Sequence, residues 1–548
     1  MKKITSILIT IMLVIGLMTG CSGNDSNSSS GDSNSSGDNS SDNESSLEGF
    51  HDAGYPIVDE PMTFTAFNVT ANGTDFADLK YFKVLADLTN VNIEFTNTPD
   101  SDAETKMNLE LASGDLPDFF SYSIGTSNMQ KYGVEGGMFH DLTPYIDKYM
   151  PNLQVAMQDY PLAKVAITEM NSEVYSLPYI VDTATVAGDT LYLRTDMLDK
   201  VGLEVPKTIE DFYSMLTAFK EANWADDFSP FLPTNKEAME GVLFPSFGEA
   251  TDPGFADKGD GKTVVYNYTS EQYKLYLEFV NKLYTEGLLE KDIYAMDTDA
   301  INAKVKEGKG AVVTAGTQLT ADYFDSGKID IVMLSPMKSQ YTETQKIRGL
   351  TSVQVGGATI SKSCESPEVL ARYFDIAYSK EDVGGVKGLE GISIWLGIRG
   401  EDWDYTGDNN EYFKRIVPEG LKMSEEEYRY TNIAPGAAGW GTVVIKGLPY
   451  GNPSQEMKGY QSVTNLYPYM VPRFPEAYLK FTPEESEVLT NKLTEIKTYV
   501  DSMKASFITG IEPLSNWDTY VDTVKQMGID EVLKAYQAAY DRMNELTK

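Results

Sequence analysis

The chain has 548 residues and a formal net charge of −37, with 82 acidic and 45 basic side chains but only two histidines and two cysteines. Such acidity repels nucleic-acid phosphates, which argues against a nucleic-acid partner, and it favours a monomer. Two histidines and two cysteines are too few for a histidine–cysteine metal centre, so neither a metal nor another cofactor is expected.

The first twenty residues follow the pattern of a signal peptide. Lys2 and Lys3 precede an apolar run over residues 4–18, and two small residues stand directly before Cys21. The run is shorter than the roughly 20 residues that span a bilayer. The segment resembles a bacterial lipoprotein signal, which implies that Cys21 is lipidated and anchors the protein to membrane lipid on the outer, extracytoplasmic face of the cell membrane. The alternative is an uncleaved anchor in which Cys21 is incidental.

Residues 21–50 consist almost wholly of Ser, Gly, Asn and Asp. A segment without apolar side chains cannot offset the loss of chain entropy on folding, so a disordered tether is predicted. A flexible coil of about 28 residues reaches roughly 30 Å. The tether would therefore let a folded body move relative to its anchor.

The start of the body alternates between strand and helix patterns. Residues 62–70 have strand-like alternation, residues 75–90 have helical spacing, and residues 91–97 form a second strand pattern. A helix that ends at Gly114 and a third strand within residues 116–125 follow. This order predicts an α/β layer built on a parallel sheet.

Capping signals mark later helices. Thr208 with Asp211 predicts one helix start, and Thr269 or Ser270 precedes an amphipathic helix. Residues 310–316 read as a strand. Ser366 and Pro367 open a further helix, and the chain ends in helices, the first of which begins at Thr482 and ends at Gly510.

Several of these segments resemble one family in the order of that family. They are residues 111–120, 191–212, 283–294, 307–316 and 528–542. The family comprises the extracytoplasmic solute-binding lipoproteins of carbohydrate ABC transporters, that is, extracellular solute-binding protein family 1, in its long lipoprotein subgroup. The resemblance implies a two-lobe α/β fold of the periplasmic-binding-protein-like type II, with a hinge between the lobes.

The same resemblance implies a function and a domain plan. The protein would capture an oligosaccharide or similar polar solute between the lobes and deliver it to integral-membrane permease subunits, without catalysis. Lobe 1 would comprise residues 51–180 and 353–400, and lobe 2 residues 181–352 and 401–548, which include the C-terminal helices. The chain would cross between the lobes near residues 177–185 and 352–360 and return once more after residues 395–405.

Candidate ligand contacts combine aromatic plates with polar groups. Sugars have flat C–H faces and hydroxyl edges, and the chain holds 34 tyrosines, 23 phenylalanines and five tryptophans. For each aromatic residue, a place in the ordinary core is the alternative. By alignment with the family, the loop after the third strand faces the ligand, and Ser121 lies in that loop. The candidate ligand contacts are Tyr122, Ser123, Tyr179, Asp182, Trp224, Thr317, Gln318, Trp395 and Trp440.

Some relatives carry a calcium loop in the second lobe. The nearest pattern here, residues 257–266, lacks a third ligand position and the closing Glu, so a turn before a strand is predicted. Asp226 and Asp227 adjoin each other without a loop glycine, and no metal is assigned to them either.

The sequence is also compatible with two other functions. A cell-surface glycoside hydrolase would need paired carboxylates across a sugar cleft, and 82 acidic residues cannot forbid such a pair. A ligand sensor for a membrane kinase would share the binding-protein fold. Nucleophilic catalysis would need His140 as its base, and no nucleophile motif adjoins it.

Overall fold

The computed structural model describes the chain over most of its length after residue 46. The described residues are 47–70, 73–182, 190–222, 224–233, 236–314, 331–349, 353–379, 392–407, 412–436, 442–444, 448–449 and 461–547. Leu47–Lys548 forms one compact unit. The predicted signal peptide, Cys21 and nearly all of the predicted tether lie outside the described residues.

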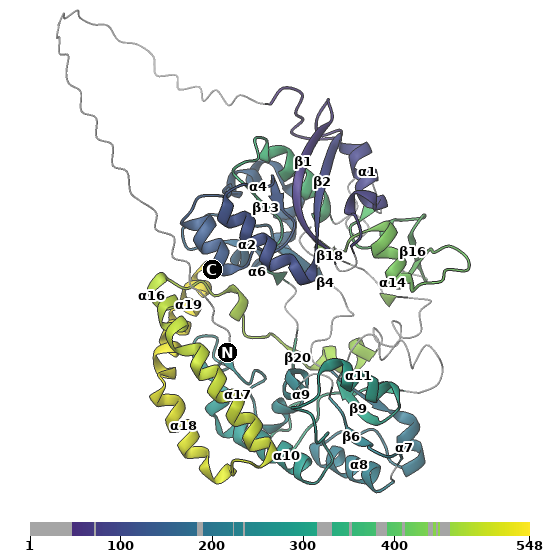
Figure 1. Ribbon diagram of the computed structural model, residues 1–548, viewed down its shortest axis with the longest axis vertical. Coiled ribbons are helices and arrows are strands. Elements are labelled where there is room, and N and C mark those ends of the chain that lie inside the picture. Colours follow the sequence, from purple (N-terminus) through teal and green to yellow (C-terminus); the bar gives the residue numbers. More distant parts are fainter. Residues whose placement is uncertain are drawn as a thin grey trace, which may run out of the picture. The chain divides into compact units, whose positions relative to one another are not determined.

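The first sheet is built from the predicted strand–helix alternation. β1 (Met62–Thr70) pairs in parallel with β2 (Val91–Pro99) and with the short β3 (Phe119–Phe120), and the edge strand β13 (Thr359–Ile360) pairs antiparallel with β3. The intervening helices α1 (Lys80–Thr89) and α2 (Ala103–Ser113) accompany this sheet in Figure 1. The parallel sheet is confirmed. Only the antiparallel edge departs from a purely parallel pattern.

Local sequence explains where these helices stop. Asn90 and Gly114 both adopt the left-handed conformation directly after α1 and α2, which satisfies carbonyls at the helix ends. The predicted stop at Gly114 is confirmed. Three later helices each have proline in their first turn, where the missing N–H costs nothing: α4 (Thr143–Tyr149), α5 (Pro151–Asp159) and α6 (Pro161–Ile167).

A second four-stranded sheet has mixed directions. β5 (Leu191–Arg194) pairs antiparallel with β10 (Ile331–Met333) and with β9 (Gly310–Thr314), and β6 (Ser229–Phe231) adds in parallel to β9. Helices α7 (Thr195–Val201), α8 (Ile209–Glu221), α9 (Lys236–Leu243), α10 (Glu271–Thr285) and α11 (Thr298–Lys306) belong to this part of the chain.

The predicted helix starts in this region are confirmed. The Asp211 N–H donates to Thr208 Oγ1 over 3.0 Å, and the Thr208 N–H donates to Asp211 Oδ2 over 3.1 Å, which makes a full capping box for α8. Of the two residues proposed for α10, Ser270 is the cap, because its hydroxyl accepts the Tyr273 N–H.

A small third sheet joins segments that are far apart in the sequence. β4 (Tyr179–Asp182) pairs antiparallel with β12 (Val353–Gln354) and in parallel with β18 (Thr442–Val444). The first two strands lie in the two segments predicted to cross between the lobes, and the third follows the predicted later return. The sheet β12-β4-β18 is called the hinge sheet below.

Two glycines let the backbone segments beside the hinge sheet approach closely. Gly356 has a φ of +93°, and a Cβ on it would lie 2.0 Å from Ser123 Oγ. A Cβ on Gly357 would lie 2.4 Å from the carbonyl oxygen of Leu177. Any other residue at either position would therefore push the loop after β3 or the segment before β4 out of place.

The described residues between 392 and 436 include several that pack against α1, which accompanies the first sheet. The hairpin of β16 (Trp403–Thr406) and β17 (Tyr412–Arg415) follows β14 (Ile392–Ser393) and β15 (Gly397–Ile398). Lys80, at the start of α1, forms ion pairs with Glu401 at 2.8 Å and with Asp402 at 2.9 Å. Residues just beyond the boundary predicted at residue 400 thus contact α1, a helix that accompanies the first sheet.

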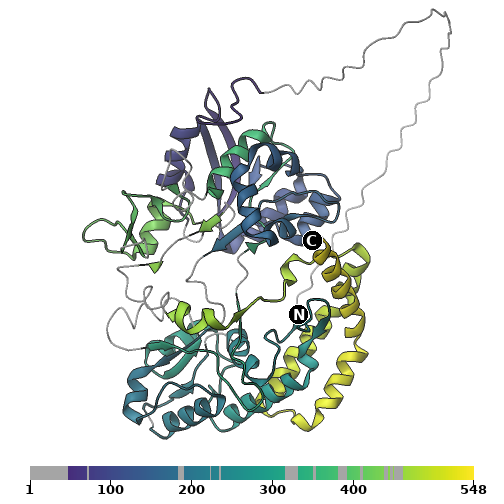
Figure 2. The same ribbon diagram turned by 180° about the vertical axis from the view of Figure 1, so that it is seen from behind.

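The chain ends in a group of helices, as predicted. They are α16 (Pro483–Val488), α17 (Thr494–Thr509), α18 (Trp517–Gln526) and α19 (Ile529–Leu546), drawn in yellow-green and yellow in Figure 2. Thr482 and Glu485 form the predicted capping box, and the left-handed Gly510 ends α17. Asn281 of α10 donates to the carbonyl oxygens of Phe507 and Ile508, which fixes α17 on the second sheet's helices.

Short elements complete the described chain. They are α3 (Thr126–Asn128), β7 (Phe255–Asp257), β8 (Val264–Tyr266), β11 (Ile347–Arg348), α13 (Pro367–Asp375), α14 (Glu425–Tyr428), β19 (Leu448–Pro449) and β20 (Met470–Val471). Within the described ranges, no helix combines the length and the apolar character that crossing a bilayer requires.

Candidate ligand-binding site

A cavity of about 470 Å³ opens where the strands of the first sheet end. Its wall combines the carboxyl end of β1, the loop after β3 and residues that follow α14. The carboxyl ends of parallel strands are where α/β sheets bind ligands, because loops and helix starts converge there. The cavity, called the strand-end cavity below, is therefore the candidate ligand site.

A chain of polar side chains backs this cavity. Ser121 Oγ donates to Asn68 Oδ1 over 2.6 Å, and Asn68 Nδ2 donates to Asn97 Oδ1 over 3.0 Å. Asn97 Nδ2 continues the chain to Asp75 Oδ1 over 2.8 Å. Asn68 and Ser121 both line the cavity, so their amide and hydroxyl groups are held in fixed orientations in its wall.

Thr70 is an unsatisfied polar residue in the same wall. It is only 4% exposed, and its Oγ1 has no hydrogen-bond partner among the residues that the structure describes. Leaving a buried hydroxyl unpaired costs about 1–3 kcal/mol. A ligand hydroxyl in the adjoining cavity would supply the missing partner.

Aromatic rings provide the apolar part of the site. Tyr122 is 36% exposed and lines the cavity together with Tyr430 and the buried Phe76. Phe76 is held by Phe82, whose ring stacks on it at 5.9 Å between centroids. An exposed tyrosine ring beside fixed polar groups suits a ligand with flat C–H faces and hydroxyl edges.

Arg429 is the one basic residue among those that line the cavity, and its charge is already engaged. Its Nε and Nη2 donate to Glu426 Oε1 over 3.1 and 2.6 Å, and its Nη1 donates to the Ala434 carbonyl over 2.9 Å. Burial raises the pKa of Glu426, but Arg415 and Arg429 together bring it below its ordinary value. Arg429 therefore positions the wall and does not offer a free cation.

Trp395, predicted as a ligand contact, lies next to this cluster. The guanidinium carbons of Arg415 and Arg429 each lie 5.9 Å from its ring centroid, and its carbonyl accepts a long 3.4 Å bond from Arg429. The ring is half-buried and also meets the edge of Phe413. The structure brings Trp395 beside a wall residue of the strand-end cavity.

The predicted residues nearer the hinge sheet lie apart from that wall. Ser123 faces Gly356 in a small cavity of about 70 Å³, which also involves Glu169 and Lys480. Tyr179 begins β4 opposite Gln354 and is half-buried. Asp182 is the last residue of the same strand.

The remaining predicted contacts are not joined to this site by any described contact. Trp224 packs on the core beyond α8, where the Lys200 ammonium lies 5.1 Å from its ring centroid. Thr317, Gln318 and Trp440 lie outside the described residues.

Sequence reasoning missed several wall residues, among them Asn68, Thr70, Asp100 and Arg429. Asn68 and Thr70 carried a usable signal, since polar residues at the carboxyl end of the first parallel strand point to the ligand-binding edge of a sheet. Arg429 carried no such signal, because it lies far along the chain.

The two acidic segments considered for calcium have other partners. Asp257 and Asp260 accept backbone N–H groups within the β7–β8 hairpin, so the predicted turn before a strand is confirmed. Asp227 lies 3.2 Å from the ammonium of Lys304, which also pairs with the buried Glu290 at 2.5 Å. A lysine side chain thus neutralises these acids.

His140 and Cys364 are adjacent but unsuited to nucleophilic catalysis. His140 Nε2 donates to the backbone carbonyl of Cys364 over 3.1 Å, not to its thiol. Burial raises the pKa of the Cys364 thiol to about 12, so almost no thiolate forms near neutral pH. This pair plays no recognisable catalytic part.

The fold and this site define a two-lobe solute-binding protein, and the family comparison agrees. Residues 73–383 match the bacterial extracellular solute-binding protein family, and the chain belongs to this family. The family predicted from the sequence segments is thereby confirmed.

Characterised relatives span most of the chain at low identity. The fructooligosaccharide ABC transporter substrate-binding protein FusA of Streptococcus pneumoniae is 24% identical over 478 residues, which is 83% of this chain and 85% of FusA. Lipoprotein LipO of Bacillus subtilis is 27% identical over 481 residues, which is 84% of this chain and 88% of LipO.

Solved structures agree on the fold. An extracellular solute-binding protein from Bifidobacterium longum subsp. infantis has a TM-score of 0.71 at 22% identity, over 88% of this chain and 98% of that protein. S. pneumoniae FusA in complex with kestose has a TM-score of 0.67 at 20% identity, over 88% and 100%. The predicted two-lobe type II fold is confirmed.

Proposed function

We propose that this protein is the substrate-binding component of an ATP-driven importer and that it captures an oligosaccharide at the strand-end cavity. The observation that carries the proposal is the wall itself. It sets an exposed tyrosine, Tyr122, beside the fixed amide and hydroxyl groups of Asn68 and Ser121. FusA is named for fructooligosaccharides and its structure contains kestose, which supports the same ligand class here.

The charges of the wall favour an uncharged sugar. Asp100 is its one acidic residue, and Arg429 is already bound to Glu426. A uronic-acid carboxylate would meet the Asp100 carboxylate without gaining a free cation, whereas neutral hydroxyl groups can donate to Asp100.

The same wall argues against glycoside hydrolysis at this position. That chemistry needs two carboxyl groups about 5–10 Å apart across the scissile bond. Among the residues that line the strand-end cavity only Asp100 carries one. Binding without turnover fits this arrangement better.

The proposal extends to anchoring and to lobe boundaries. Cys21 would be lipidated and hold the protein on the outer face of the membrane, where the body meets the permease subunits. Lobe 1 would take residues 51–180 and 353–436, because the ion pair of Lys80 with Asp402 ties the residues after 400 to α1. Hinge motion would then occur at the hinge sheet.

Binding and turnover can be measured together. The full chain is screened on a glycan array of neutral and acidic oligosaccharides, and hits are titrated by calorimetry while chromatography checks that the sugar is intact. A neutral oligosaccharide is expected to bind unchanged. Tyr122→Ala should weaken it about tenfold, or about 1.4 kcal/mol. Tyr341→Ala, which removes another exposed tyrosine, should not.

Thr70→Val adds a second readout. It removes the unpaired hydroxyl and keeps the shape, so unfolding stability should stay the same or rise while sugar affinity falls. The proposal fails if no glycan binds, if the sugar is cleaved, or if both variants bind like the unaltered chain.

A further inference from the structure

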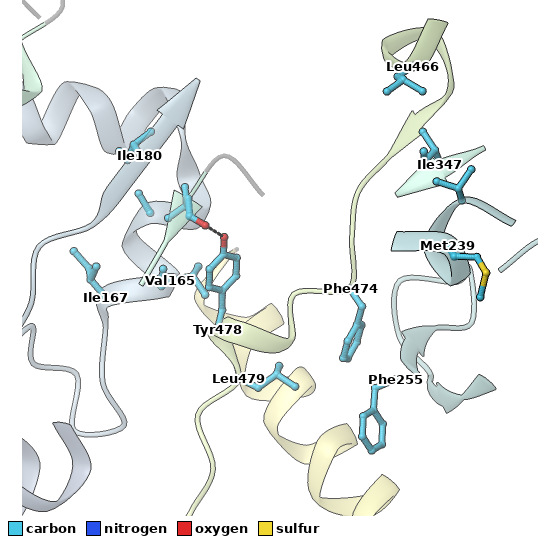
Figure 3. Close-up of a cluster of buried hydrophobic side chains, with 14 of the residues drawn as sticks. Val165, Ile167, Ile180, Met239, Phe255, Ile347, Leu466, Phe474, Tyr478 and Leu479 are labelled. Carbon is cyan, nitrogen blue, oxygen red and sulfur yellow. Dashed lines mark hydrogen bonds between the residues drawn. The ribbon is translucent and has the colours of Figure 1, made fainter. Parts of the chain in front are cut away.

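A second and larger cavity shares no lining residue with the strand-end cavity. It measures about 550 Å³ and is bounded by α9, the end of β8, α17 and the segment that follows β20. Figure 3 shows part of that segment, with Phe474 beside Phe255 and Tyr478 directed to the opposite side. It is called the α9–α17 cavity below.

Three polar groups in its wall have no protein partner among the described residues: one is buried, and two are exposed to solvent. Within the described ranges, the Tyr266 hydroxyl has no hydrogen-bond partner, although Tyr266 is only 6% exposed. Neither the ammonium of Lys497 nor the carboxylate of Glu237 has an ion-pair or hydrogen-bond partner among the described residues. A donor, an acceptor and a group that can serve as either thus line one cavity.

The other charged groups of this wall already have protein partners. Arg348 and Arg473 share Asp252, at 3.6 and 3.8 Å. The buried Glu240 accepts the Tyr273 hydroxyl over 2.5 Å and lies 3.6 Å from the Lys504 ammonium. The pKa of Glu240 is raised, chiefly by its burial, and Lys504 opposes that rise.

Glu476, a further acid of the wall, accepts the Tyr536 hydroxyl over 2.7 Å. Lys497 and Glu237 are the two charged groups of this wall without a protein partner in the described ranges, and they carry opposite charges. A ligand with charge of only one sign would pair with one of them and be repelled by the other. An uncharged ligand rich in hydroxyl groups can bind both, since each hydroxyl donates and accepts.

We propose that the α9–α17 cavity is a second saccharide site, separate from the strand-end cavity, and that it takes an uncharged sugar of two or three rings. Its volume lies within the roughly 300–1,000 Å³ of small-molecule sites. Lys497 would donate to one sugar hydroxyl, Glu237 would accept from another, and Tyr266 would gain its missing partner. The ligand class rests on the proposed function, whereas the location does not.

The test titrates the full chain with kestose, maltotriose, cellotriose, mannotriose and the acidic trigalacturonate, and it follows backbone amide exchange. At least one neutral trisaccharide is expected to protect amides in β8 and α17. Lys497→Met should weaken this binding about tenfold. Lys534→Met, which removes an exposed lysine from the neighbouring α19, should leave it unchanged.

Tyr266→Phe distinguishes a direct loss of sugar binding from a loss caused by misfolding. Since the hydroxyl has no partner, its removal should not lower unfolding stability, yet it should weaken the sugar that protects β8. The proposal is overturned if no neutral trisaccharide at millimolar concentration protects β8 and α17, if only trigalacturonate does, or if Lys497→Met binds normally.

Tyr122→Ala separates the two sites. Protection of β8 and α17 that persists in this variant supports the second site. If Tyr122→Ala abolishes all binding, only the strand-end cavity binds sugar, and the second site is wrong while the proposed function stands. If only the Lys497 and Tyr266 variants lose binding, the assignment of the strand-end cavity is wrong instead.

Discussion

Asp375 shows how a single buried carboxylate can serve as a cap and still titrate unusually. It is 5% exposed, and its two oxygens accept the backbone N–H groups of Asn152 and Leu153 at the start of α5. Desolvation outweighs these hydrogen bonds and raises its pKa from 3.8 to about 6. The Asp375 carboxyl is therefore ionised above about pH 6, and keeping that charge buried lowers the stability of the folded protein.

This shift gives a signed dependence of stability on pH. Between about pH 4 and 6 the unfolded chain has lost the Asp375 proton while the folded chain keeps it, so this group makes stability fall as pH rises. About two pKa units correspond to at most ~3 kcal/mol. In urea unfolding followed across this range, Asp375→Asn should flatten that part of the profile.

Asp147→Asn, which alters an exposed carboxylate on the adjacent α4, should keep the slope. The lost hydrogen bonds of Asp375→Asn shift stability equally at every pH, so the slope is the informative quantity. An unaltered slope in Asp375→Asn would show that Asp375 is not the group responsible.

Residue-level prediction of the site was partial for a physical reason. Tyr122 was accessible to prediction because the family resemblance places the loop after the third strand at the ligand. Arg429 and Trp395 meet only through tertiary packing, and nothing in their local sequence indicates it. Trp224 is predicted as a ligand contact like Trp395, yet it packs against Lys200.

At the level of elements, the hinge sheet depends on a tight fit at Gly356. Its backbone has a φ of +93°, and a Cβ there would lie 2.0 Å from Ser123 Oγ. Gly125, two residues beyond Ser123, has a similar φ of +79° but open space around a Cβ. Comparing substitutions at the two glycines therefore separates the cost of backbone strain, which both share, from the cost of a steric clash, which only Gly356 has.

Gly356→Ala should destabilise the protein clearly more than Gly125→Ala. Both variants bear a backbone cost of about 1 kcal/mol, and only Gly356→Ala adds a clash of roughly 1–3 kcal/mol. Free energies of unfolding in urea provide the measurement. Adding Ser123→Gly should recover part of the loss in Gly356→Ala, and equal losses in the two alanine variants would refute the clash.

Elements with local signals were predictable and those without were not. β1 occupies the predicted residues 62–70, and the caps at Thr208 and Thr482 lie where the sequence indicates, because capping and alternation are read from adjacent residues. β13 and β18 are two or three residues long and pair with distant strands. Their pairing depends on the assembled fold.

For the whole molecule, the proposed anchor makes a prediction with an internal control. The chain has two cysteines, Cys21 in the lipoprotein-like segment and the buried Cys364. Two acyl chains bind a bilayer durably, since each buried methylene contributes about 0.8 kcal/mol. Cys21→Ser should therefore move the protein from the membrane fraction into the soluble fraction.

Cys364→Ser should leave the protein in the membrane fraction, with at most a loss of stability from the buried site. Fractionation and mass analysis of the mature N-terminus measure both effects. Membrane retention of Cys21→Ser would point to the uncleaved anchor instead.

The segment between β20 and α16 connects the hinge sheet to the C-terminal helices. The Tyr478 hydroxyl donates to the Val353 carbonyl of the hinge sheet, drawn as a dashed line in Figure 3, and Lys480 pairs with the buried Glu169 at 2.7 Å. Arg542 of α19 holds the carbonyl of Lys480. The segment between β20 and α16 thus links the hinge sheet to α19. If hinge motion occurs at that sheet as proposed, cleaving the chain in this segment should loosen the hinge without removing a ligand contact of the strand-end cavity.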